Sequence, residues 1–157
     1  MDIARAVADI PSGLFVTSVK DSKSGTIAGF LASWVQQVSF KPLRVAIAIR
    51  PTRNVYNDVA NGAIFSLGIV GEEVREFMKY FWSGYGEDEN PYDQLEWYES
   101  ETGGVVLRDA KSTIVLKKHE LIEAGDHHLI IADVLESIEQ QPEVDSYVHR
   151  RRDGLSY

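Results

Sequence analysis

Hydrophobic residues along this chain fall mostly into short runs that are rich in β-branched and aromatic side chains and are bounded by Gly, Pro, Asp and Ser. Runs of this kind are typical of β-strands joined by turns. The expected strands cover residues 13–19, 26–32, 33–40, 43–49, 63–70, 113–121 and 128–137, with a short one near 145–149. Because neighbouring strands are joined by short turns, the pattern favours a mainly β fold built as an antiparallel barrel.

Three shorter stretches have the pattern of helices. Asp2 can cap a helix over residues 2–8, and Thr52 can cap another over residues 53–60. A third helix is expected over residues 72–81, because apolar side chains recur there at helical spacing. Its apolar face would consist of Val74, Phe77, Met78 and Phe81.

Residues 83–104 form a long segment without a strand or helix pattern, rich in Gly, aromatic and acidic residues. Loops of this length within a domain are usually functional or disordered. Tyr85, Tyr92, Trp97 and Tyr98 favour packing, because disordered segments carry few aromatic side chains. We therefore expect this acidic loop to be ordered, and to serve as a lid over a site or as a docking surface for a basic partner.

The composition excludes several kinds of site. The chain of 157 residues contains no cysteine, which removes disulfides, thiolate nucleophiles and iron–sulfur clusters. His127 and His128 are adjacent, so on a strand they would point to opposite faces and could not bind one metal ion together, and no metal site is expected. Redox chemistry would therefore depend on a bound organic cofactor.

Nothing in the sequence divides the chain, so residues 1–157 are expected to form one domain. The apolar runs are much shorter than the ~20 residues of a membrane span. Residues 1–13 include acids and lack the continuous apolar core of a signal peptide. A cytoplasmic protein that does not bind membranes is the expectation.

Charge is distributed unevenly along the chain, whose net charge of −8 disfavours binding to nucleic acid. Residues 22–57 contain no acid and five bases, whereas residues 80–107 contain no base and seven acids. The five bases are Lys23, Lys41, Arg44, Arg50 and Arg53. A phosphorylated ligand would be attracted to the first segment, although both segments could equally be solvated surface. The basic run at residues 150–152 is too short for a nucleic-acid patch.

Residues 32–42 (ASWVQQVSFKP) combine polar and aromatic residues in an unusual way. Ser33, Gln36, Gln37 and Ser39 alternate irregularly with large apolar residues, which a plain core strand would not do. These side chains could hydrogen-bond the polar edge of a heterocycle, with Trp34 or Phe40 packed on its face. The alternative is an amphipathic strand whose polar face is exposed to solvent.

Three segments carry a resemblance to a known family. They are residues 10–17 (IPSGLFVT), residues 32–42 and residues 125–134 (GDHHLIIADV). Together they resemble the flavin-reductase-like FMN-binding family, in particular the C-terminal domain of photosynthetic-type diiron flavoproteins. The resemblance implies the FMN-binding split barrel, a Greek-key antiparallel barrel with two or three short helices. It also implies a homodimer with each flavin at the subunit interface.

The resemblance also implies a site. Ser33, Trp34, Val35 and Gln37 would contact the flavin ring and ribityl chain, with Ser39 towards the phosphate. The candidates for binding the phosphate itself are Arg50, Thr52 and Arg53. His127 would lie near the flavin and help to position the nicotinamide, unless it only holds a turn through Asp126. The chain departs from the family pattern at residues 41–43, at Gly68 and at Ala132–Asp133.

Two functions are compatible with these features. The first is a flavin reductase, an FMN-binding oxidoreductase that transfers hydride from NADH or NADPH to flavin. The second is a non-enzymatic FMN-binding electron-transfer module serving a protein partner such as a diiron flavoprotein. FAD in place of FMN, and the choice of nucleotide, stay open. No substrate-binding pattern of pyridoxamine-phosphate oxidases can be mapped onto this sequence.

Overall fold

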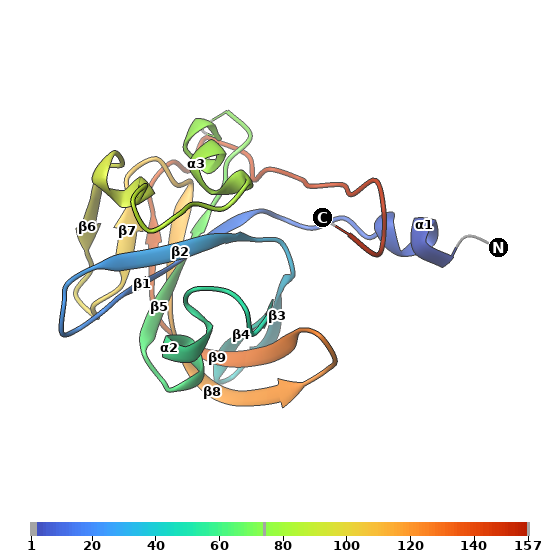
Figure 1. Ribbon diagram of the computed structural model, residues 1–157, viewed down its shortest axis with the longest axis horizontal. Coiled ribbons are helices and arrows are strands. Elements are labelled where there is room, and N and C mark those ends of the chain that lie inside the picture. Colours follow the sequence, from blue (N-terminus) through green and yellow to red (C-terminus); the bar gives the residue numbers. More distant parts are fainter. Residues whose placement is uncertain (1–2, 74, 157) are drawn as a thin grey trace.

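The structure is a computed structural model that describes residues 3–73 and 75–156, and its centre is a seven-stranded antiparallel sheet (Figure 1). The strands of this sheet are β1 Phe15–Lys20, β2 Ile27–Ala32, β3 Val35–Phe40, β4 Leu43–Ile49, β5 Ile64–Ile69, β8 Ser112–Glu123 and β9 His128–Glu139. Their order across the sheet is β2-β1-β5-β8-β9-β4-β3. The expected mainly β, antiparallel architecture is confirmed, and the strand expected over residues 43–49 is confirmed at both ends.

The sheet curls so that its two edge strands, β2 and β3, follow each other in the sequence but do not pair within the described residues. Ser33 and Trp34 connect the two edges. The backbone N–H of Ala48 on β4 donates to the Trp34 carbonyl at 3.0 Å, which fixes this connection against the sheet. The barrel is thus split between β2 and β3, and the polar-aromatic segment singled out in the sequence begins at the split.

Two apolar clusters stabilise the fold. The first fills the barrel interior and includes the fully buried side chains of Ile47, Phe65, Leu116 and Ile130. The second lies between the barrel and the segment that follows β5, where Phe81 and other apolar side chains pack. β1 and β5 each bury four consecutive residues, which is why such strands stand out in the sequence as short apolar runs.

Of the three helices, the second and third are shorter than expected, whereas the first ends at Ala8 as expected. They are α1 Ile3–Ala8, α2 Tyr56–Ala60 and α3 Lys79–Trp82, with 3-10 turns η1 Glu76–Met78 and η2 Pro91–Asp93. None of the described helices is long and apolar enough to cross a bilayer. The expected capping residue Asp2 and the helix-face residue Val74 lie outside the described residues.

Thr52 does not cap a helix, so this prediction is wrong. The backbone N–H of Arg53 donates to the Arg50 carbonyl, and that of Tyr56 to the Arg53 carbonyl, which makes two consecutive turns before α2. The helix expected over residues 72–81 is also too long. Glu72 N–H donates to the Asp145 carbonyl at 2.8 Å and Glu72 and Glu73 form a bend, so helical turns begin only at η1.

The acidic loop is ordered and packs on β2, as its aromatic residues indicated. It contains η2 and the strand β6 Trp97–Glu99, which pairs with β7 Val105–Leu107. Tyr92 is only 4% exposed, and its hydroxyl lies 2.5 Å from that of Ser18. Burial raises the pKa of Tyr92. A Cβ added at Gly29 of β2 would lie 2.1 Å from the Tyr92 hydroxyl oxygen, so the close contact requires glycine there.

The two ends of the chain extend from the barrel together, with α1 beside the C-terminal segment (Figure 1). We call α1 and residues 150–156 the terminal arm. Arg151 donates to the Val7 carbonyl at 3.1 Å, which links the two halves of the arm. The prediction of a strand near residues 145–149 is wrong. Only isolated bridges form there, one from Ser146 to Gly71 and one from His149 to Ser12.

Candidate functional site

Ser33 lies at the split of the barrel with an unusual buried hydroxyl. The residue is 6% exposed, and its Oγ has no hydrogen-bond partner within the described part of the chain. A buried polar group left without a partner costs about 1–3 kcal/mol. Thr17 Oγ1 is the other buried hydroxyl without a partner among the described residues, but only Ser33 lines a hollow, so its hydroxyl is positioned to hydrogen-bond a ligand at the split.

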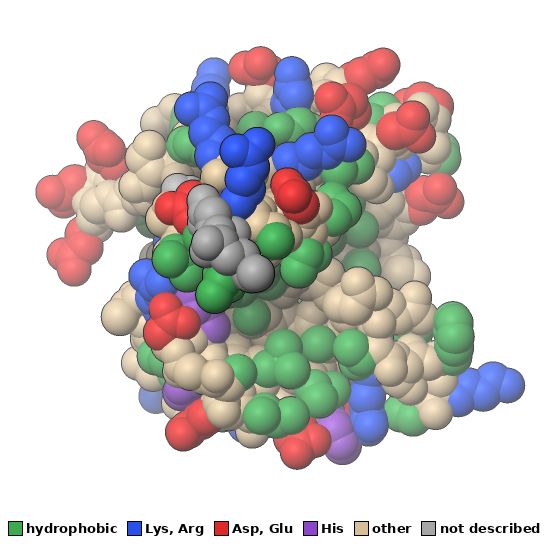
Figure 2. All heavy atoms as spheres, turned by 90° about the vertical axis from the view of Figure 1, so that its right-hand side faces the viewer, with side chains coloured by type: hydrophobic (Ala, Val, Ile, Leu, Met, Phe, Trp, Pro, Cys, Tyr) green, Lys and Arg blue, Asp and Glu red, His purple; other side chains and the backbone are tan. Residues whose placement is uncertain are grey.

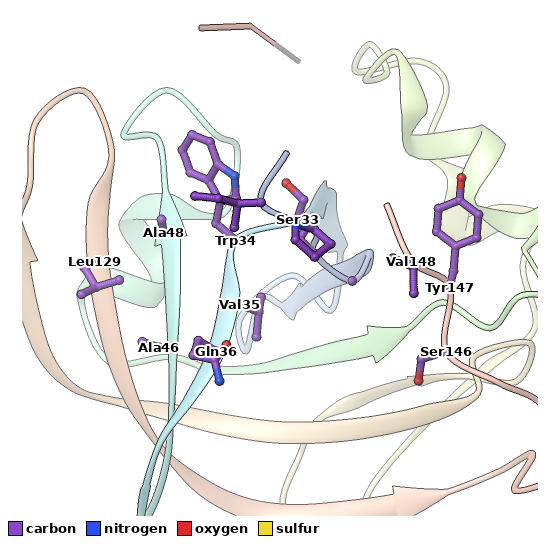
Figure 3. A pocket seen from close by; sticks show the side chains of 14 residues that line it. Ser33, Trp34, Val35, Gln36, Ala46, Ala48, Leu129, Ser146, Tyr147 and Val148 are labelled. Carbon is purple, nitrogen blue, oxygen red and sulfur yellow. The ribbon is translucent and has the colours of Figure 1, made fainter. Parts of the chain in front are cut away.

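Beside Ser33 there is an open hollow of about 570 Å³, which we call the central hollow. Its floor is formed by Trp34 and Val35 together with Ala46, Ala48 and Leu129 from β4 and β9 (Figure 3). Residues 10–13 and 146–148 line the other side. The small alanines leave room over the sheet, and the volume lies within the range of ligand pockets. The hollow is thus lined mainly by apolar side chains.

Two smaller hollows, each about 170 Å³, lie on either side of Arg53. We call them the Arg53 hollows. One is shared with Ser33 and His149, and the other with Thr52 and Tyr85. The Arg53 guanidinium lies 5.1 Å from the Phe30 ring centroid, so the cation is packed against β2. Because Ser33 lines both the central hollow and the first Arg53 hollow, a ligand at the split could reach Arg53 and Thr52.

A further hollow of about 170 Å³, the His127 hollow, also borders Trp34. The His127 and Trp34 ring centroids are 4.7 Å apart. His127 Nδ1 lies 2.9 Å from one carboxylate oxygen of Asp126, and Arg50 Nη2 donates to the other at 3.1 Å. The hydrogen bond with His127 holds the pKa of Asp126 below its usual value. Asp126 therefore fixes both His127 and Arg50 beside Trp34.

The structure brings most of the sequence-predicted site residues to the split, although into different hollows. Ser33, Trp34 and Val35 line the central hollow. Thr52 and Arg53 share an Arg53 hollow. Arg50 and His127 line the His127 hollow with Trp34, so Arg50 is turned towards Asp126 and away from Thr52.

Gln37 and Ser39 lie further along β3, beyond the hollows described above. Gln37 is exposed, and its side-chain amide lies 3.4 Å from the Ser39 carbonyl. Their assignment to a flavin therefore stays a prediction. Gln36 lines the central hollow instead.

Two features of the site were not expected from the sequence. Tyr85 of the acidic loop accepts hydrogen bonds from the backbone N–H of Gly29 at 2.9 Å and from the Asn54 side chain at 3.1 Å, which brings this loop to the Arg53 hollow. Arg151 reaches the His127 hollow from the C-terminal segment. The basic run at residues 150–152 is the sequence feature that contains Arg151, and it did not indicate a role at this site.

Comparison with known proteins adds the following. Residues 7–156 match the family model described as flavin reductase like domain. "Putative diflavin flavoprotein A 6" of Nostoc sp. is 29% identical over 99% of this chain and 27% of its own length. "Diflavin flavoprotein A 1" of Synechocystis sp. is 25% identical over the same shares. The chain thus spans about a quarter of the length of these curated relatives.

Solved structures show the same fold. The Streptomyces globisporus C-1027 NADH:FAD oxidoreductase SgcE6, in complex with NAD and FAD fragments, superposes with a TM-score of 0.81 at 20% identity, over 93% of this chain and 85% of that one. The styrene monooxygenase flavin reductase of Pseudomonas putida S12 gives a TM-score of 0.79 at 21% identity, over 93% and 90%. Identities this low support the fold alone, which agrees with the expected split barrel.

Proposed function

The chain belongs to the flavin reductase like domain family, and from this premise we propose that it binds FMN at the split and transfers hydride to it from NADH or NADPH. The buried, unpartnered hydroxyl of Ser33 carries the proposal. It lies where the central hollow meets an Arg53 hollow, so a ring and a phosphate could be bound on either side of it. The solved relative bound to NAD and FAD fragments supports both ligand classes.

The residues present fit a flavin mononucleotide. The Ser33 hydroxyl would hydrogen-bond the polar edge of the ring, and Trp34 and Val35 would pack against its apolar part. Thr52 and Arg53 would bind the phosphate, since a guanidinium forms charge-assisted hydrogen bonds with phosphate oxygens. We assign Arg50 mainly to the nucleotide side, because it is paired with Asp126 beside His127.

Direct hydride transfer needs orientation and exclusion of water more than it needs an acid or base. When bound, the flavin ring supplies the hydride-accepting chemistry. His127, held by Asp126 and packed near Trp34, would position the nicotinamide. The apolar floor of the central hollow would keep water from the reacting atoms.

We further propose that the protein is a homodimer. Val38, Phe40 and Leu43 are 50%, 84% and 45% exposed around the β3–β4 turn. Apolar side chains exposed together often mark an interface. Two-fold symmetry is the commonest arrangement for a second copy. Light scattering at micromolar concentration should give twice the mass of the chain; a mass of about 17.6 kDa would contradict the dimer.

One experiment separates the two functions. The purified protein is loaded with FMN or FAD, dialysed extensively and then mixed anaerobically with NADH or NADPH. We expect FMN to be retained better than FAD, and the flavin absorbance to fall with at least one nucleotide. Loss of both flavins on dialysis, with no measurable affinity, would refute the proposal.

The electron-transfer module is the second candidate. The exposed acids of the loop after Tyr85 would then contact a basic partner. Tight retention of FMN with no reduction by either nucleotide would select this candidate over the reductase.

A further inference from the structure

The C-terminal segment crosses the mouth of the His127 hollow. Arg151, Leu155 and Ser156 line this hollow together with Trp34 and His127. The Arg151 guanidinium lies 5.2 Å from the Trp34 ring centroid, a cation–π distance. Figure 2 looks at the face from which the terminal arm projects, and Lys and Arg side chains gather on its upper part above exposed hydrophobic ones.

A glycine fixes the position of this segment. A Cβ added at Gly154 would lie 2.1 Å from the carbonyl oxygen of Ala4 in α1, a distance that side chains do not reach. The same Cβ would lie 3.0 Å from Cβ of Val7. Together with the hydrogen bond from Arg151 to the Val7 carbonyl, this contact holds the segment beside α1 and over Trp34.

Arg50 is paired with a carboxylate, whereas Arg151 is not paired with one among the described residues. Arg50 forms an ion pair with Asp126 at 3.1 Å. For Arg151 the contacts are a backbone carbonyl and an aromatic face, and no carboxylate lies within ion-pair distance among residues 3–73 and 75–156. A guanidinium in this setting retains donors and charge for an anion.

We propose that Arg151 binds the phosphate groups of the pyridine nucleotide and that the terminal arm forms the outer wall of the nucleotide site. The proposal rests on the proposed reductase function. It assigns the two phosphate-bearing ligands to different cations, FMN to Arg53 and the nucleotide to Arg151. In this proposal the nucleotide binds at the His127 hollow, which the acidic loop does not line. The nucleotide phosphates therefore avoid repulsion by the acids of that loop.

The test compares two adjacent arginines in the FMN-loaded protein. Arg151→Ala should raise the Kd of NADH and NADPH about tenfold or more, the loss expected for one charge-assisted hydrogen bond. The limiting rate of flavin reduction and the Kd of FMN should stay within about twofold, because Arg151 is not part of the flavin site. Arg152→Ala is the matched control: Arg152 is exposed, and its removal changes the net charge equally.

A second pair of variants tests the position of the arm without removing a charge. Gly154→Ala should displace the segment from α1 and raise the nucleotide Kd in the same direction. Gly86→Ala is its control, because an added Cβ there meets nothing within 4 Å. Both measurements come from anaerobic stopped-flow reduction at increasing nucleotide concentration, with FMN affinity measured separately by fluorescence.

The outcomes separate this inference from the proposed function. If the unaltered protein is reduced but Arg151→Ala behaves like Arg152→Ala, the role of Arg151 is overturned and the reductase stands. An increase in the FMN Kd alone would also overturn it, because Arg151 would then belong to the flavin phosphate. If the unaltered protein retains FMN but neither binds nor is reduced by either nucleotide, the reductase and this inference fall together.

Discussion

Replacing Tyr85 with Phe should loosen the attachment of the acidic loop to the barrel while leaving its ring in place. The Tyr85 hydroxyl accepts the backbone N–H of Gly29 at 2.9 Å and the side-chain amide of Asn54 at 3.1 Å. Asn54 follows Arg53 directly and also donates to the Gly29 carbonyl at 3.1 Å. One oxygen atom therefore connects the loop, the edge strand β2 and the turn that contains the candidate phosphate site.

The size of the effect follows from the two lost hydrogen bonds. Each neutral hydrogen bond contributes about 1 kcal/mol, so the free energy of unfolding should fall by about 2 kcal/mol. For a chain of this size that corresponds to a decrease in Tm of about 4–8 °C. The ring contact with Phe81, with centroids 6.1 Å apart, is retained and adds nothing to the change.

Thermal unfolding followed by circular dichroism measures this change, and amide hydrogen exchange at Gly29 locates it. Tyr98→Phe is the matched control. The Tyr98 ring lies 5.3 Å from the Arg108 guanidinium, and its hydroxyl makes no hydrogen bond within the described residues, so its Tm should hardly move. Equal Tm values for both variants, with unchanged exchange at Gly29, would refute the attachment through Tyr85 and favour a loop that opens as a lid.

Three more predictions concern the site itself. Ser33→Ala should leave the stability of the flavin-free protein unchanged or slightly higher, since it removes an unsatisfied hydroxyl, yet weaken FMN binding by about 0.5–1.5 kcal/mol; equal FMN affinity in a fluorescence titration would count against the site. Arg53→Ala should weaken FMN binding about tenfold or more and Arg50→Ala much less, as measured by the same titration; the reverse order would move the phosphate to Arg50. His127→Phe should raise the pKa of Asp126 towards the ordinary value of an aspartate, because the His127 hydrogen bond is the main cause of the lowering and Phe has no donor to replace it. The lowered pKa of Asp126 in the folded state stabilises the protein above pH 3.8, and this contribution is lost as the pH falls through the folded-state pKa. The pKa of the Asp126 carboxyl, measured by NMR titration, should therefore be higher in the variant. An unchanged pKa would contradict the assignment.

Most of the barrel could be predicted because buried strands consist mainly of apolar residues, which are visible in the sequence. In β4 almost every residue is apolar, and the strand was expected at the residues where it is found. Predicted helices failed where contacts with distant residues decide the backbone. The backbone N–H of Glu72 is bonded to the distant Asp145, and the turns at residues 50–56 leave room for only the short helix α2. Neither interaction leaves a local pattern in the sequence.

The candidate site divides in the same way. Ser33 and Trp34 stood out because polar and aromatic residues are mixed within one short segment, and both lie at the split. Arg151 and Tyr85 come from segments far along the chain, and only the folded barrel brings them to the same site. Arg50 and Arg53 are three residues apart, yet the turn between them directs them to different hollows.

The two-residue connection between β2 and β3 also constrains how this chain can change its length. Ser33 and Trp34 are both the bridge between two unpaired sheet edges and the lining of the central hollow. An insertion or deletion there would alter the spacing of the edges and the shape of the hollow at once. The turn at residues 21–26 and the acidic loop neither connect the two sheet edges nor line the central hollow, and surface loops tolerate length changes. Homologous chains should therefore differ in length in those loops, and keep the connection at residues 33–34 constant.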